Sequence, residues 1–213
     1  MTSLSRRAFA TAATAATAAL LAGCGGHQAG NADATVGARS TSPSARPAAK
    51  TAKTAKTVQA LERSVPVRLQ IPAIGVDTPV MQLGLAADGT VEVPPITAHD
   101  RAGWYRNSPT PGQTGPSVIL AHVTVGRYGD GVFRDLARLR QGDRITARLE
   151  NGTAPEFTVT AVRTVAKSEF PTDAVYGDVD RPELRLITCG GPRTGDGYLD
   201  NVIVFAALTS AGS

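Results

Sequence analysis

The sequence is poor in cysteine and in aromatic residues. It holds two cysteines, Cys24 and Cys189, and aromatic residues make up 5% of its 213 positions, against 42% hydrophobic residues. The spacing of these two cysteines and the three histidines does not suggest a zinc site. Neither a metal nor a cofactor is expected. The scarcity of aromatic residues predicts an aliphatic core, and the length favours one folded domain.

A long apolar run is also missing. The longest one begins after Arg6-Arg7 and extends for about 15 mostly small residues, short of the roughly 20 needed to span a membrane. A basic end, an apolar stretch and small residues before Cys24 are the layout of a secretory signal, so residues 1–24 are predicted to be a signal peptide. The segment SRRAF resembles a twin-arginine export signal, and a Sec signal is the open alternative.

The signal ends in Leu21-Ala22-Gly23-Cys24, which resembles the bacterial lipobox. This resemblance implies lipidation of Cys24 as the first mature residue; an uncleaved anchor and simple secretion are the alternatives. With Cys24 acylated, Cys189 has no disulfide partner within the chain, which makes it a candidate reactive thiol. A buried structural cysteine is the other interpretation.

Residues 25–64 lack apolar periodicity and are rich in Ala, Thr, Ser, Gly and Pro, so they are predicted to be a disordered tether. Residues 1–64 hold eight of the 22 Lys and Arg and two of the 18 Asp and Glu, which leaves residues 65–213 with a net charge of −2. The basic excess therefore belongs to the leader and tether. Nucleic acid is not expected as a partner, and anionic lipid or wall polymers near the tether are favoured.

The remaining residues, 65–213, consist of short β-prone segments separated by turn residues. Residues 65–79 are interrupted by prolines and predict an edge strand or a broken pair of strands. Residues 81–93 predict a hairpin around Asp88-Gly89, and residues 144–149 and 156–165 predict another around Asn151-Gly152.

Between these segments, residues 118–123 predict a short buried strand ending at a histidine, His122, and residues 132–139 predict a short helical turn. Residues 94–117 and 167–181 are expected to be mostly loop, with the only tryptophan, Trp104, anchoring the first of them. About eight strands with one or two short helices predict a mainly β fold, a closed eight-stranded barrel.

The strongest chemical signal surrounds Cys189. Residues 184–189 alternate in a β-branched run that stops at Gly190-Gly191-Pro192, and residues 201–206 form a second run. We expect a strand that carries Cys189 at its last position, followed by a flexible loop. Because loops carried on a rigid sheet often hold reacting groups, Cys189 is a candidate nucleophile.

Five segments occur in a recognisable order: LQIPAIGVDTPV, AGWY, SPTPGQTGPSVILAHV, FRDLARLRQGDRI and LRLITCGG. Together they resemble the sortases of Gram-positive bacteria, most closely the actinobacterial class F group, over about residues 65–208. The most specific part is the order of His122 and Cys189, each closing a predicted strand.

The resemblance implies a sortase domain over residues 65–213, built on an eight-stranded barrel and acting as a cysteine transpeptidase of the hydrolase class. Cys189 would attack the carbonyl after Thr in an LPXTG-type sorting signal of a surface protein, and His122 would protonate the leaving amine. A peptidoglycan amine would then resolve the acyl-thioester. An imidazolium near a thiol favours the nucleophilic thiolate, which gives the pair a physical basis. A monomer tethered by its amino terminus at the extracellular face of the membrane is expected.

The resemblance also implies an arginine in the strand after the cysteine loop, at the position of Leu199. Arg193, four residues after Cys189, is the candidate replacement that holds the substrate oxyanion. Leu199 motivates a second hypothesis, a catalytically weak sortase-like lipoprotein that binds peptides or cell wall. A third, a cysteine L,D-transpeptidase, usually has His and Cys close in sequence, whereas here they are 67 residues apart.

Overall fold

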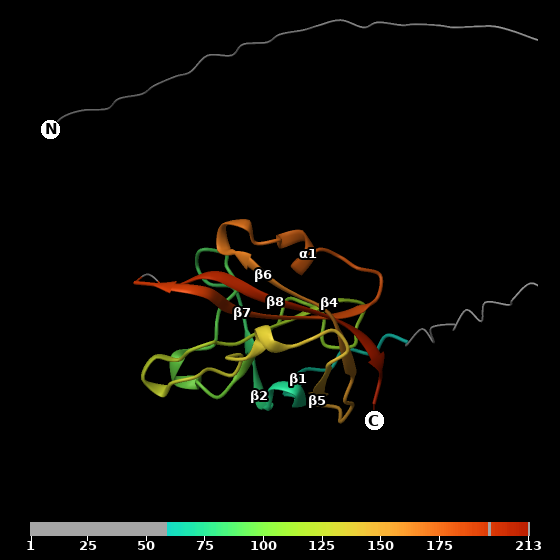
Figure 1. The fold of residues 1–213 in the computed structure, drawn as a ribbon. Helices are drawn as coiled ribbons and strands as arrows, with labels where there is room; N and C mark the ends of the chain where they lie inside the picture. Colours follow the sequence, from blue (N-terminus) through green and yellow to red (C-terminus); the bar gives the residue numbers. More distant parts are fainter. Residues whose placement is uncertain (1–58, 196, 213) are drawn as a thin grey trace, which may run out of the picture. The chain divides into compact units, whose positions relative to one another are not determined.

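Eight strands form a closed barrel in the order β1-β2-β3-β4-β7-β8-β6-β5. Figure 1 shows the fold as a ribbon, with most of these strands labelled. The computed structural model describes residues 59–195 and 197–212, so the predicted signal peptide, Cys24 and most of the predicted tether lie outside the described residues. The predicted mainly β, closed eight-stranded barrel is confirmed. The strands are Pro66–Ile71 (β1), Val76–Leu83 (β2), Ala102–Tyr105 (β3), Gly115–Leu120 (β4), Arg144–Leu149 (β5), Glu156–Ala166 (β6), Pro182–Thr194 (β7) and Gly197–Ser210 (β8).

The helical segments of the described residues are all short. They are the α-helix Thr172–Tyr176 (α1) and the 3-10 turns Pro72–Ile74 (η1), Ile96–Ala98 (η2), Gly126–Tyr128 (η3), Leu136–Arg138 (η4) and Lys167–Glu169 (η5). None of them is long and apolar enough to cross a membrane.

The pairing of β4 with β7 is parallel and joins residues 67 positions apart, with Val118 opposite Arg185 and Leu120 opposite Ile187. Side chains alternate between two faces along each strand. One face of β7, with Leu184 and Leu186, fills the barrel interior. The opposite face packs beneath α1 in a second apolar cluster that includes Val118, Leu120, Val175, Ile187 and Ile203.

Trp104 anchors its segment as expected, although it lies on strand β3 and not in a loop. Its side chain is 0% exposed, and its indole Nε1 donates a hydrogen bond to the Pro109 carbonyl at 3.2 Å. The guanidinium of Arg63 lies 5.4 Å from the centre of the Trp104 ring, and the Leu61 amide donates to the Gly112 carbonyl at 2.8 Å. The chain therefore contacts the barrel a few residues before β1 begins.

The strand predicted to end at Cys189 is longer than expected. β7 continues to Thr194 and pairs with β8 beyond Cys189, so the Gly190-Gly191-Pro192 stretch is not a loop. The register shifts between Gly190 and Arg193, and Gly191 has φ of +70°. A bulge of this kind accommodates a proline that a regular ladder position does not.

Other boundaries also differ from the predicted ones. β4 ends at Leu120, two residues before His122, and residues 81–93 form a regular strand only to Leu83, followed by a single bridge between Leu85 and Val91. The helical turn expected over residues 132–139 is limited to η4. The predicted loop 167–181 contains η5 and α1, and the predicted hairpin of β5 and β6 is confirmed.

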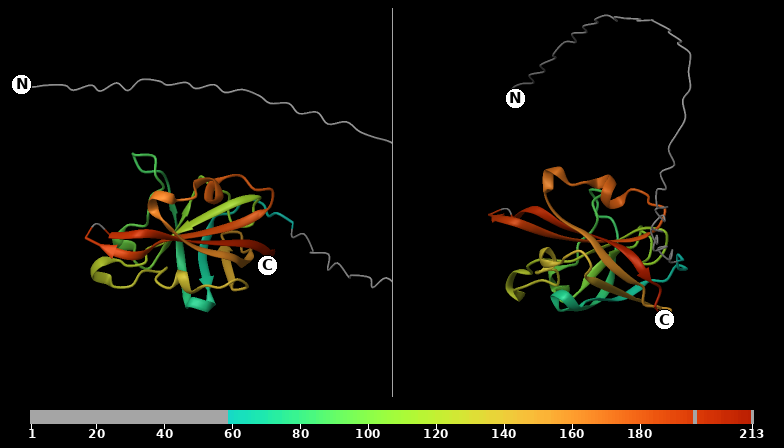
Figure 2. Two further views of the ribbon diagram at one scale, coloured as in Figure 1. Left: turned by 45° about the horizontal axis from the view of Figure 1, so that its top comes forward. Right: turned by 45° about the vertical axis from the view of Figure 1, so that its right-hand side comes forward.

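β7 and β8 run side by side as a long ribbon whose turn lies at one end of the barrel (Figures 1 and 2). The first described residues and the carboxyl terminus lie close together at the other end in all three views. Near that end the Ala154 amide donates to the Gly212 carbonyl at 2.9 Å. The stretch of β7 that follows Cys189 therefore leads away from the end where the chain enters the barrel.

Candidate active site

The pairing of β4 with β7 brings His122 and Cys189 to the same level. The last paired residues are Leu120 and Ile187, and continuing this register by two positions places His122 opposite Cys189. The Ala121 amide extends the ladder by donating to the Ile187 carbonyl at 3.2 Å, and the Thr188 hydroxyl donates to the Ala121 carbonyl at 2.7 Å. Residues opposite each other in this register share a face, and neighbouring strands lie about 4.8 Å apart. His122, just beyond the end of β4, therefore lies beside Cys189 of β7.

A cavity of about 220 Å³ is lined by both His122 and Cys189, which confirms that the two residues lie close together. His122, Cys189 and Arg193 all line it, so the three predicted site residues are brought together although the chain separates the first two by 67 positions. The remaining lining residues are Val123, Thr124, Lys167, Gly197 and Tyr198. Cys189 is a free, half-buried thiol.

The His122 ring is held by the connection between β2 and β3. Its Nε2 atom lies 2.5 Å from the Pro94 carbonyl oxygen. A carbonyl accepts hydrogen bonds and never donates them, so Nε2 must carry the proton. Nδ1 is then the ring nitrogen left for a reacting group. No sequence pattern predicts this contact, since a backbone carbonyl has no residue signature.

Arg193 reaches the cavity from β7, on the far side of the bulge from Cys189. It pairs with Tyr198 across the hairpin, and its guanidinium lies 5.7 Å from the centre of the Tyr198 ring. Contact with an aromatic face favours this placement of a cation. Leu199, the position where the resemblance implied an arginine, is 49% exposed and does not line the cavity.

Lys167 is the lining residue that sequence reasoning missed. It follows β6 directly, and in the whole sequence no lysine comes after it. The signal was available, because residues 65–213 hold thirteen arginines and this single lysine. The lining of this cavity contains two cations, Lys167 and Arg193, and no Asp or Glu.

A second cavity, of about 420 Å³, reaches Cys189 from the side of η4. Phe133, Ala137, Thr188 and Val202 are among its lining residues. Cys189 therefore lies at the boundary of two separate openings. No group of three or more His, Cys, Asp or Glu within the described residues is arranged to hold a metal ion.

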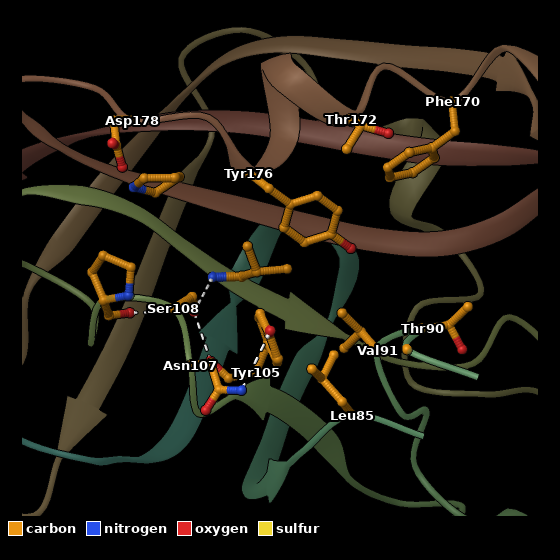
Figure 3. Close-up of a pocket in the computed structure, with 14 residues that line it drawn as sticks. Leu85, Thr90, Val91, Tyr105, Asn107, Ser108, Phe170, Thr172, Tyr176 and Asp178 are labelled. Carbon is orange, nitrogen blue, oxygen red and sulfur yellow. Dashed lines mark hydrogen bonds between the residues drawn. The ribbon is translucent and has the colours of Figure 1, made fainter. Parts of the chain in front are cut away.

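The largest cavity, of about 710 Å³, lies farther along the same sheet face (Figure 3). Val118 of β4 lines it, and His122 comes four residues later on the same face. In Figure 3, Tyr176 of α1 projects over β4 toward Tyr105, with Leu85 and Val91 beside them. Burial, aided by the neighbouring Tyr105 phenol, raises the pKa of Tyr176, which keeps that phenol neutral. The lining of this cavity is mostly apolar and includes the phenol hydroxyls of Tyr105 and Tyr176.

The wall formed by α1 is fixed to the sheet by Arg185. This side chain is 3% exposed and lies on the same face of β7 as Ile187 and Cys189. Its Nε donates to the Ala174 carbonyl at 3.2 Å, and its Nη2 donates to Glu183 at 2.6 Å. The guanidinium also lies 4.7 Å from the centre of the Phe205 ring. A buried cation therefore joins the wall of the largest cavity to the strand that carries the thiol.

Comparison with known proteins gives a consistent result. A family model described as a sortase domain matches residues 69–209. No curated protein matches the chain.

Solved structures resemble the barrel. Sortase A from Corynebacterium diphtheriae superposes with a TM-score of 0.52 at 21% identity, covering 70% of this chain and 62% of that chain. Listeria monocytogenes sortase A gives 0.52 at 18% identity, covering 70% and 89% of the two chains. A Clostridium perfringens sortase D5 transpeptidase gives 0.50 at 23% identity, covering 69% and 79%. These likenesses show a shared fold.

Proposed function

The chain belongs to the sortase family, and on that premise we propose that it is a cell-surface cysteine transpeptidase with Cys189 as nucleophile and His122 as general acid. Its substrate is an LPXTG-type sorting signal of a surface protein, and its acceptor is a cell-wall amine. The observation that carries the proposal is the shared cavity of His122 and Cys189, which follows from the β4–β7 register.

The chemistry proceeds in two halves. The Cys189 thiolate adds to the carbonyl that follows Thr, and the resulting oxyanion collapses to an acyl-thioester as the amine leaves. His122, with Nε2 held by Pro94, supplies the proton for that amine from Nδ1. The acceptor amine then adds to the thioester, returning a proton to His122, and the Cys189 thiolate is released. Arg193 donates to the oxyanion from β7.

The largest cavity is suited to the apolar part of the signal. An extended peptide advances about 3.3 Å per residue, so the four positions from Val118 to His122 correspond to about four peptide residues. A peptide with its scissile carbonyl at Cys189 thus reaches the apolar lining near Tyr105 and Tyr176. The 420 Å³ opening beside Phe133 is left for the acceptor amine.

The finer assignments belong to the same proposal. Class F membership is supported by the resemblance of the segments within residues 65–208, and lipidation of Cys24 with tethering at the extracellular face of the membrane is supported by the sequence features of residues 1–64. The enzyme is proposed to act as a monomer. The direction of β7 after Cys189, away from the end where the described chain enters the barrel, supports this tethered arrangement.

Intact mass spectrometry tests the reaction directly. The full-length protein in detergent is incubated with a panel of LPXTG-type peptides, with and without short amine-bearing wall peptides. We expect a peptide-sized adduct on the wild type that hydroxylamine removes, as a thioester requires. Cys189→Ala should show no adduct, and His122→Ala should acylate at least about 100-fold more slowly.

Absence of both adduct and cleavage across the panel would contradict the proposal and favour a peptide-binding role. Membrane attachment has a separate test, because lipidation adds a diacylglycerol mass at Cys24. A mature protein that lacks this mass would overturn the lipoprotein assignment and leave the transpeptidase assignment intact.

A further inference from the structure

The cavity around Cys189 contains a cation, Lys167, that directly follows a third strand, β6, and the sheet register locates the end of that strand. β8 pairs with β7 through Asn201 opposite Cys189, and with β6 through Asn201 opposite Val165. Cys189, Asn201 and Val165 therefore form one row across three strands, with side chains on the same face. Lys167 lies two residues beyond Val165, at the start of η5, and it lines the same cavity as Cys189.

Only a long side chain can act across this separation. Two strand spacings separate the β7 and β6 backbones by about 10 Å, Lys167 lies two residues beyond the row of Cys189, and a lysine stem of four carbons reaches roughly 6 Å. Lys167 is exposed, lines the same cavity as His122 and Cys189, and forms no ion pair with any carboxylate of the described residues. Its ammonium is therefore available to a group bound at Cys189.

We propose that Lys167 is a catalytic residue that donates to the oxyanion formed at the substrate carbonyl. This inference rests on the proposed function. As the Cys189 sulfur forms its bond to carbon, the carbonyl electron pair moves to oxygen, and the Lys167 N–H groups meet that oxygen. When the pair returns, the C–N bond breaks, and the amine leaves with a proton from His122. Lys167 keeps its protons throughout, and nothing is oxidised or reduced.

The two cations of the cavity approach from different sides. Arg193 comes from β7 and is held against Tyr198, whereas Lys167 comes from the end of β6. Continuing the β6–β8 register by one residue places Lys167 opposite Leu199, an exposed apolar side chain. An arginine at position 199 would therefore bring a cation to the same region from the neighbouring strand.

The test compares the acylation rates of full-length variants, measured by rapid quenching and intact mass. Lys167→Met should acylate about 100-fold more slowly than wild type, since loss of one oxyanion donor typically costs 10²- to 10³-fold. The KM should change little, because the donor acts in the transition state. Lys167→Arg should recover most of the rate, and so should Lys167→Met combined with Leu199→Arg.

Arg163→Met is the matched control. Arg163 is an exposed cation on β6, the strand that Lys167 directly follows, but it lies over the Phe205 ring and does not line the cavity. It should acylate at the wild-type rate. Thermal melting of each variant shows whether a slow rate reflects unfolding, which the exposure of Lys167 makes unexpected.

A wild type that acylates while Lys167→Met keeps its rate overturns this inference and leaves the proposed function standing. Equal slowing of acylation in Lys167→Met and Arg163→Met also overturns it, because the loss of any nearby positive charge would then have the same effect. A hydroxylamine-resistant adduct mapped to Lys167 would show that its amine is a nucleophile and not an oxyanion donor. A wild type that forms no thioester overturns both proposals.

Discussion

Gly191 is the residue where backbone conformation most directly supports the site. Its φ of +70° lies in the left-handed region, and a Cβ there would collide with the Asp200 carboxylate on the facing strand. Gly191→Ala should destabilise the protein by about 1 to 3 kcal/mol and slow acylation, because the bulge that follows Cys189 must shift. Urea unfolding and the acylation rate measure the two effects.

Gly195→Ala provides the comparison within the same hairpin. A Cβ at Gly195 meets no atom within 4 Å, so this variant should remain close to wild type in both measurements. If Gly191→Ala behaved like Gly195→Ala, the bulge would not constrain Cys189.

Among single residues, the sequence predicted His122, Cys189 and Arg193 as site residues, and the structure brings them to one cavity. It did not predict Lys167 or the Pro94 carbonyl. Lys167 enters the site through the pairing of β6 with β8, and Pro94 acts through a backbone atom. Neither contact produces a local pattern, so a reading of neighbours along the chain does not find them.

Among the elements, the connection between β2 and β3 controls the orientation of His122. Its first residue is joined to its middle, because Glu92 Oε2 accepts from the Gly84 amide at 2.6 Å and the Glu92 amide donates to the Gly84 carbonyl at 3.1 Å. Two residues later the Pro94 carbonyl contacts His122. Glu92→Ala should release this segment and lower kcat by about tenfold, because small displacements of a catalytic group are costly.

Glu92→Gln should restore most of the activity, since an amide oxygen also accepts from Gly84 N. The measurement is kcat and KM for a cleaved peptide, with the melting temperature recorded for each variant. A kcat for Glu92→Ala equal to that of wild type would show that His122 does not depend on this connection.

The elements themselves were predictable to different degrees. The β5–β6 hairpin has a turn signal and alternating flanks, and it was placed correctly. β3 and α1 were missed, because four or five residues with few apolar positions carry little periodicity. The strand predicted to end at Cys189 was too short, because Gly190-Gly191-Pro192 resembles a loop. Pairing with β8 holds these residues in β7 as a bulged strand. The partner strand supplied information that the local residues lacked.

For the whole molecule, closure of the barrel depends on β7, which pairs on both sides, and on a buried carboxylate near its start. Burial of Glu183 favours its protonated form, but hydrogen bonds from Arg185 and Arg181, each at 2.6 Å, more than offset this. The pKa of Glu183 is therefore lowered from its ordinary value of 4.5. A lowered carboxyl pKa means that the unfolded chain binds the proton more tightly than the folded protein.

This difference in proton affinity determines how the stability of the barrel changes as the pH falls. The contribution of Glu183 is complete above pH 4.5 and is lost as the pH falls from there through the lower pKa of the folded state. Glu183→Gln, which does not titrate, should be less stable than wild type at pH 7 and should lose less stability than wild type between pH 5 and pH 3. Melting temperatures across that range measure both slopes.

Asp77 offers a matched comparison in the same barrel. Its pKa is lowered by a hydrogen bond from Arg68, but both side chains are exposed. Salt screens exposed pairs far more than buried ones. The difference between wild type and Asp77→Asn should therefore shrink in 0.5 M salt, whereas the difference between wild type and Glu183→Gln should persist. Equal salt sensitivity of the two differences would mean that Glu183 is solvated in solution and that the Arg185 anchor beneath α1 is looser than the structure has it.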